Sequence, residues 1–250
     1  LALAKPVEFL ISKAVKFCNN TANAALIVTF FTIVVSLFNW GLGLIFGAIF
    51  ARKVAEHCIK NNLALNYPII GAAGYSGLMV WHGGLSGSAP IKIAEPGHFL
   101  ADKTGVILQN ETIFSNMNLA VSVSLLIILP LSLYFLAGRS KNYSFRLNEI
   151  QQLEPKHEIL TVSGSEKLDH SKIPAYLFGS IILLLSFYQA FVKPTEINLA
   201  FITPNYINFL LLGLCVIFHG SFFHFLNAVD NAIAGASGIL IQFPLYFGIM

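Results

Sequence analysis

The sequence predicts an all-α polytopic membrane protein with a re-entrant hairpin and broken helices. Hydrophobic residues make up 56% of the 250 residues and charged residues only 11%, where a soluble domain carries about 25% charged residues. The mean hydropathy is +0.71. A helix needs about 20 apolar residues to cross the hydrocarbon, and six stretches without Asp, Glu, Lys or Arg reach that length: 17–51, 61–91, 112–138, 173–192, 197–229 and 231–250.

This composition excludes a disordered chain, a nucleic-acid-binding protein and an ordinary cytosolic enzyme. The net charge of +3 is too small to indicate an acidic partner. Cys18, Cys58 and Cys215 lie far apart and form no C-x-x-C motif, so we interpret them as buried small apolar residues. We expect no metal site and no cofactor.

The first charge-free run is too long for one ordinary span. Its 35 residues would form a helix of roughly 50 Å. Asn39, Gly41 and Gly43 in its middle are helix-breaking signals. Two interpretations remain: one long tilted helix, or two short helices that meet at Asn39–Gly41.

The flanking charges favour the second interpretation. Lys13 and Lys16 precede the run, and Arg52 and Lys53 follow it. Because basic flanks stay on the cytoplasmic side, a single crossing would put one flank on the wrong side. We therefore expect a re-entrant hairpin at 22–52, with its tip near mid-membrane.

The next crossings follow from this sidedness. Residues 66–90 are expected to cross outward as a broken span, and the loop 91–112 has a net negative charge that suits the outside. Residues 113–138 then return to a basic end at Arg139 and Lys141.

The remaining chain divides at a polar segment. Residues 139–172 predict a cytoplasmic linker between a first transport unit, 1–138 with an amphipathic start, and a second unit, 173–250, expected to be incomplete at its C-terminus. In the second unit, 174–192 would go out and 205–227 would return, followed by a second element from about Ala228 onward.

The stretch 82–90 indicates a polar site inside the membrane. It holds three glycines, two serines and a proline, which cannot form a stable lipid-facing helix. Its freed backbone groups need partners, so we expect a broken helix that lines a binding site. The alternative is an exit loop at the outer surface. Gly71, Gly74 and Gly77 recur every three residues and predict close helix packing.

Four titratable residues are candidates for a proton or ion relay: His82, His219, His224 and Asp230. His82 could also bind a carboxylate, or simply pack beside Trp81. His219 and His224 lie about 140° apart around a helix, which argues against a shared metal. Asp230 could equally mark the membrane boundary.

The two units share a short, weak sequence similarity. Residues 81–85, Trp-His-Gly-Gly-Leu, are similar to residues 218–222, Phe-His-Gly-Ser-Phe. The predicted spans run in opposite directions, as inverted repeats would.

Residues 38–47 together with 67–90 resemble the bacterial short-chain fatty acid transporter family. The resemblance runs through most of the chain and is strongest over 36–98. It implies a secondary carrier of organic anions with inverted repeats, two re-entrant hairpins and a dimeric scaffold. The first hairpin tip would be Asn39–Gly41 and the helix break Ser86–Ser88. Family members are much longer, so the second hairpin would lie beyond Met250.

The implied cargo is a butyrate- or acetoacetate-like monocarboxylate, and the implied location is the bacterial cytoplasmic (inner) membrane. The partners would be this anion, the lipid bilayer, a second copy of the chain, and H⁺ or Na⁺, because anion uptake against the membrane potential needs a coupling cation. The expected substrate-binding residues are Asn39, Trp40, Gly41, His82, Gly83, Gly84, Ser86, Gly87 and Ser88.

One alternative function is a rhomboid-like intramembrane serine protease. Residues 84–87, Gly-Leu-Ser-Gly, spell a G-x-S-G motif. Ser86 would then act with His219 or His224 as the base.

Overall fold

The chain folds into helices in a computed structural model that describes residues 4–141, 166–193 and 201–230, with Ala2, Gly164, 232–233 and Leu245 besides. No strand occurs in these described parts, which confirms the predicted all-α class. The helices are α1 (Lys5–Val15), α2 (Thr21–Phe38), α3 (Trp40–Lys60), α4 (Tyr67–Tyr75), α5 (Ser88–Ile93), α6 (Ala101–Thr104), α7 (Asn116–Arg139), α8 (Glu166–His170), α9 (Lys172–Phe187) and α10 (Pro204–His219). The chain also forms three 3₁₀ turns, η1 (Ser76–Met79), η2 (Trp81–Gly83) and η3 (Gln109–Glu111), a π turn, η5 (Tyr188–Val192), and a helix after α10, Phe222–Asp230.

The chain reverses direction at Asn39, between α2 and α3. The backbone of Asn39 is extended (φ −151°, ψ 121°), and its side chain accepts a hydrogen bond from the amide of Leu42 at 2.9 Å. One residue therefore ends α2 and caps α3. The two helices run antiparallel, because Gly43 lies against Ser36 and Gly47 against Thr32. An uninterrupted helix through position 40 is excluded, and the second arm continues to Lys60, beyond the expected end at 52.

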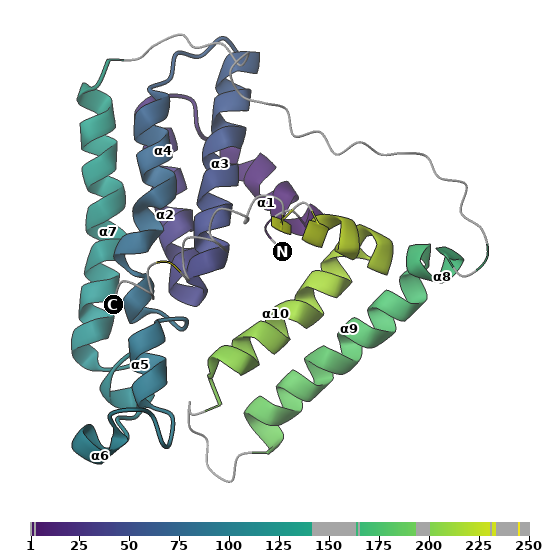
Figure 1. Ribbon diagram of the computed structural model, residues 1–250. Coiled ribbons are helices and arrows are strands. Elements are labelled where there is room, and N and C mark those ends of the chain that lie inside the picture. The colour runs from purple at the N-terminus through teal and green to yellow at the C-terminus, as the bar shows by residue number, and fades with distance from the viewer. Residues whose placement is uncertain are drawn as a thin grey trace.

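α4 packs against both arms of this hairpin (Figure 1). A Cβ atom at Gly74 would lie 2.7 Å from the carbonyl oxygen of Gly47, and one at Gly77 would collide with Ser36. Gly74 thus permits backbone-to-backbone packing, and Gly77, in η1, permits close packing on the side chain of Ser36. Gly71 has open space around its Cα, so it takes no part in that contact.

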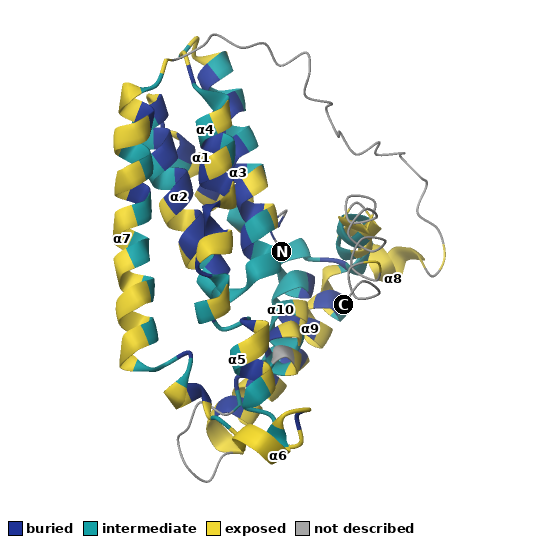
Figure 2. Cartoon of the chain, turned by 60° about the vertical axis from the view of Figure 1, so that its left-hand side comes forward, coloured by how far each residue is buried: buried dark blue, intermediate teal, exposed yellow. Residues whose placement is uncertain are grey.

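α7 lies along α2 and completes a four-helix group with α3 and α4 (Figure 1). Its outer face is exposed along most of its length (Figure 2). The exposed side chains of α7 are mainly apolar, such as Val123, Ile127 and Phe135, as expected for a helix whose solvent is lipid.

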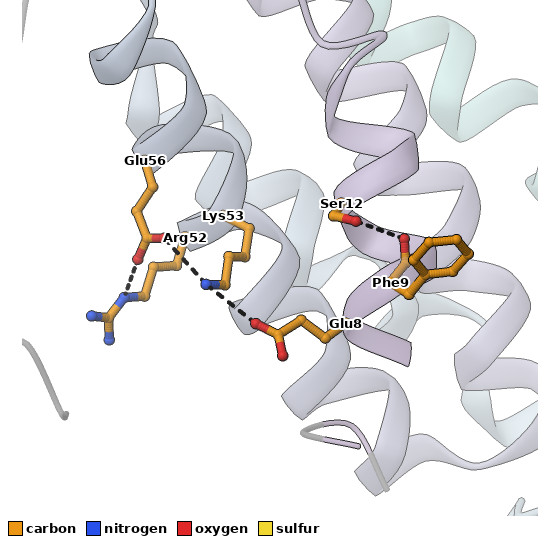
Figure 3. Close-up of polar contacts among 6 residues, drawn as sticks. All are labelled: Glu8, Phe9, Ser12, Arg52, Lys53 and Glu56. Atoms are coloured by element: carbon orange, nitrogen blue, oxygen red, sulfur yellow. Dashed lines mark hydrogen bonds and ion pairs between the residues drawn. The ribbon is translucent and has the colours of Figure 1, made fainter. Parts of the chain in front are cut away.

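The basic flanks of these helices gather at one end of the group. The amide of Asn66 donates to Thr21 Oγ1 at 3.1 Å, and its side chain donates to the carbonyl oxygen of Lys141 at 3.1 Å. Next to this end, an ion-pair cluster joins α1 to α3 (Figure 3): Lys53 Nζ lies 3.7 Å from Glu8 Oε1 and 3.3 Å from Glu56 Oε2. Such solvent-accessible pairs contribute about 0–1 kcal/mol each to stability. They therefore influence the orientation of α1 but add little to the stability of its packing.

The second group consists of α9 and α10, which lie antiparallel and side by side (Figure 1). Gly179 packs against Ile217, and Gly213 packs against Ile182. The predicted linker falls mostly on residues 142–163, which lie outside the described residues. At the opposite end, Gln109 of η3 donates a hydrogen bond to the carbonyl oxygen of Ile202, ahead of α10.

The predicted return span, 205–227, is not one continuous helix. α10 ends at Gly220, whose backbone is left-handed with a φ of 74°. The next helix, Phe222–Asp230, runs at 115° to α10. Gly220 donates to the carbonyl oxygens of Val216 and Ile217, which closes α10. Ser221 Oγ then accepts from the amide of His224 at 3.3 Å and starts the new helix.

Among the described residues, three helices are long and apolar enough to cross a membrane: Thr21–Phe38, Asn116–Arg139 and Lys172–Val192. The bent pair formed by α10 and Phe222–Asp230 passes the same test as one broken span.

Candidate functional site

The hairpin tip meets the broken stretch after α4. The amide of Trp40 donates a hydrogen bond to Ser86 Oγ at 2.8 Å, and the amide of Leu85 donates to the carbonyl oxygen of Leu37 at 2.7 Å. Gly84 approaches the Leu37 backbone so closely that a Cβ would collide with it. Two segments more than 40 residues apart therefore form one surface.

The broken stretch is a run of tight turns, as its glycines predict. Val80, Gly83, Gly84 and Gly87 each donate their amide to the carbonyl three residues earlier, at 3.0–3.2 Å. This pattern satisfies part of the backbone without an α-helix. The stretch packs on the hairpin rather than leaving it as a free loop, and α5 begins after it at Ser88.

Aromatic rings cover this surface on one side. The rings of Trp40 and Trp81 lie 5.5 Å apart, and the rings of Trp81 and His82 lie 3.7 Å apart with a 33° tilt. His82 is nevertheless exposed. The ring of His82 thus packs on Trp81, as the second interpretation expects, and its exposure is compatible with the first.

The polar atoms at the site are only partly used. Ser86 Oγ accepts the Trp40 amide, which leaves its own hydroxyl hydrogen available as a donor. Ser88 is exposed, Gly41 is half-buried, and Gly87 is buried. The side-chain oxygen of Asn39 is occupied by the helix cap. The arrangement can offer neutral donors beside an aromatic wall.

Asn118 of α7 is a site residue that the sequence did not reveal. Its Nδ2 donates to the carbonyl oxygens of Gly83, at 2.9 Å, and Ile113, at 2.7 Å. It thereby ties the broken stretch to the start of α7. The sequence shows only that an asparagine lies near the start of an apolar run, and this does not predict which residues it contacts.

The same bond fixes the height of the tip. Asn118 is the third of the 24 residues of α7, a helix about 36 Å long. The tip is therefore level with the first turn of α7, which differs from the expected position halfway along a crossing helix.

Two buried hydroxyl groups in α2 were also missed. The Oγ1 atoms of Thr29 and Thr32 are buried and have no hydrogen-bond partner among the described residues. The sequence placed both within an apolar run and gave no reason to single them out.

An apolar groove opens next to the tip, with a volume of about 220 Å³. Its walls come from the end of α2, the broken stretch and the first three turns of α7, and include Leu37, Gly84, Leu85, Asn118, Ser122 and Leu126.

The relay candidates of the second group lie elsewhere. His219 Nδ1 bonds to the carbonyl oxygen of Cys215 at 2.7 Å, and its Nε2 is buried without a partner among the described residues. His224 and Asp230 lie on the helix after the bend and are exposed. No group of three His, Cys, Asp or Glu residues that could hold a metal occurs in the described residues.

The geometry gives no support to a Ser86–His219 pair. Ser86 Oγ is hydrogen-bonded to the Trp40 amide, and His219 Nδ1 to a backbone carbonyl. A serine protease needs the serine hydroxyl within hydrogen-bond reach of its base, and no hydrogen bond joins these two side chains in the described structure.

Comparisons with known proteins agree with one another. A family model described as short chain fatty acid transporter matches residues 1–250. A protein of Escherichia coli (strain K12), provisionally named a short-chain fatty acid transporter, is 29% identical over 256 residues, covering 100% of this chain and 55% of the relative. A protein of Haemophilus influenzae (strain ATCC 51907 / DSM 11121 / KW20 / Rd) with the same provisional name is 30% identical over 259 residues, covering 100% and 56%. The chain thus spans about half the length of these relatives. No solved structure matches it.

Proposed function

Because the chain belongs to the short-chain fatty acid transporter family, we propose that the whole protein is a secondary transporter of short-chain monocarboxylates. Butyrate and acetoacetate are the type of cargo, and the cytoplasmic membrane of a bacterium is the location. Three helices with the length and hydropathy of membrane spans support this proposal.

The substrate site is the surface where the hairpin tip meets the broken stretch. The single observation that carries it is the hydrogen bond from the Trp40 amide to Ser86 Oγ. A short carboxylate needs a few donors for its head and an apolar wall for its tail. The hydroxyls of Ser86 and Ser88 and the ring of His82 supply hydrogen-bond donors for the head. The ring of Trp40 forms the apolar wall for the tail. Asn39, Gly41, Gly83, Gly84 and Gly87 shape the backbone that holds them.

In this proposal the hairpin formed by α2 and α3 enters the membrane from the cytoplasmic side, turns at Asn39 and returns to the same side. Its two basic flanks stay on the cytoplasmic side, together with Arg139 and Lys141 at the end of α7. With the tip level with the first turn of α7, the site opens near the outer surface. Irregular backbone at that depth needs a protein or water environment, which the rest of the protein and a second copy of the chain would provide.

Transport is coupled to H⁺ or Na⁺. Moving one negative charge inward against 100 mV costs about 2.3 kcal/mol, so uptake needs a driving cation. His82 at the site is the candidate for protons, with His219, His224 and Asp230 as further relay positions. Carbonyl oxygens at the broken stretch would suit sodium.

Counterflow of labelled butyrate in proteoliposomes containing the full-length protein tests the proposal. We expect butyrate-loaded vesicles to accumulate the label, and an imposed pH or Na⁺ gradient to raise uptake according to the coupling ion. Label equilibrating no faster than in protein-free vesicles would refute the transport function.

A further inference from the structure

The apolar groove beside the hairpin tip has no role in the site as described so far. Its volume of about 220 Å³ is below the roughly 300–1,000 Å³ of pockets that take drug-sized ligands. Its lining is almost entirely apolar. It therefore fits a small apolar group rather than a charged one.

We propose that this groove holds the alkyl tail of the transported carboxylate, and that α7 thereby sets the preferred chain length. The inference rests on the proposed transport function. Its structural basis is continuity: Leu85 lines the groove, and Ser86, the next residue, receives the amide of Trp40. Neighbouring Cα atoms are 3.8 Å apart, so a chain of a few carbons reaches from Ser86 into the groove.

The floor of the groove is a rigid part of the site. Asn118 donates both hydrogens of its side-chain amide, one to the carbonyl oxygen of Gly83 and one to that of Ile113. A Cβ on Gly83 would collide with that side chain. The wall nearest the carboxyl head is therefore fixed, and it offers the tail no hydrogen-bond donor from Asn118.

The far wall consists of side chains of α7. Ser122 and Leu126 line the groove one turn apart, and they are positions where volume can be added or removed. Ser124 is exposed and does not line the groove. Because it lies about 200° around the helix from Ser122, it provides a matched control.

The test is the kcat/KM of uptake for labelled acetate, butyrate and hexanoate by the full-length protein in proteoliposomes. One methylene in an apolar pocket is worth about a factor of 10 or more. We expect Ser122→Leu to lower the hexanoate-to-acetate ratio about tenfold, and Leu126→Ala to raise it. Ser124→Leu should leave the ratio as in the unaltered protein.

Two results would overturn the proposal. One is an unchanged ratio in both Ser122→Leu and Leu126→Ala, as expected if a lipid acyl chain fills the groove instead. The other is an equal shift in Ser124→Leu. If the unaltered protein carries none of the three acids, the transport function itself fails, whereas active uptake with an unshifted ratio refutes the groove alone.

Discussion

Asn39 combines two tasks at the scale of a single residue. Its extended backbone ends α2, and its side-chain oxygen accepts the amide of Leu42 and starts α3. The break was predictable, because Asn is both a good helix cap and a poor residue inside a helix. The partner of the next residue was not predictable, because Ser86 lies 46 positions from Trp40 in the sequence.

Substitutions at Asn39 separate the cap from the proposed binding role. Asn39→Ala removes the cap and should cost about 1 kcal/mol, which lowers the melting temperature of the full-length protein by about 1 °C. Asn39→Asp keeps a capping oxygen, so its melting temperature should stay unchanged. The added negative charge should nevertheless weaken butyrate uptake through repulsion of the carboxylate.

Thermal unfolding of the purified full-length variants, followed by a thiol-reactive dye, measures the first effect. Counterflow measures the second. An Asp variant that melts as early as the Ala variant would show that the side chain does not cap α3, and unimpaired butyrate uptake in Asn39→Asp would remove Asn39 from the site.

At the scale of elements, glycines decide how closely the helices approach. Gly77 has no room for a Cβ beside Ser36, whereas Gly71, two turns earlier in the same stretch, has open space. Gly77→Ala should therefore lower the free energy of unfolding by about 1–3 kcal/mol through overpacking. Gly71→Ala should be neutral or slightly stabilising, since Ala is the better helix residue.

Denaturant titration of the two alanine variants in detergent tests this difference. Equal losses of stability at both positions would contradict the packing of η1 on α2.

The two helix breaks show why periodicity and hydropathy predict some elements and miss others. Gly83, Gly84 and Gly87 are close enough together to interrupt a helix on local grounds alone, and α5 begins only at Ser88. Gly220 is one glycine within an apolar run, so hydropathy suggested that the helix continues. Its left-handed φ of 74° and the cap at Ser221 reverse that expectation, although His-Gly-Ser did contain both a stop and a start signal.

At the scale of the whole molecule, composition was enough for the all-α membrane class, and the charge-free span predicted at 113–138 placed α7 to within three residues of its observed bounds. Contacts between segments that lie far apart in the sequence could not be predicted from it. The bond of Asn118 to Gly83 and the groove beside it depend on how α7 docks on α2, and neither hydropathy nor spacing encodes that docking.

The predicted sidedness can be tested with two exposed asparagines at opposite ends of the first group. Asn61 follows α3 at the basic end, and Asn110 lies in η3 at the other. In the full-length protein with Cys215→Ala, an impermeant maleimide should label Asn110→Cys in spheroplasts and Asn61→Cys only in inverted vesicles. The reverse pattern would invert the proposed orientation.

The two remaining thiols of this chain interfere little with this measurement. Cys18 and Cys58 are buried. Burial, with a smaller contribution from Cys58, raises the pKa of the Cys18 thiol to about 12. Because the thiolate is the reactive form, Cys18 stays protonated and unreactive at neutral pH.

The backbone contact between Gly47 and Gly74 has a mechanical consequence. Where two helices touch through their main chains, no rotamer change can let one slide past the other. In the proposed transport cycle, the hairpin and α4 must then travel as a single block, together with the turns from Gly83 to Ser86 that are bonded to the hairpin tip and to Asn118.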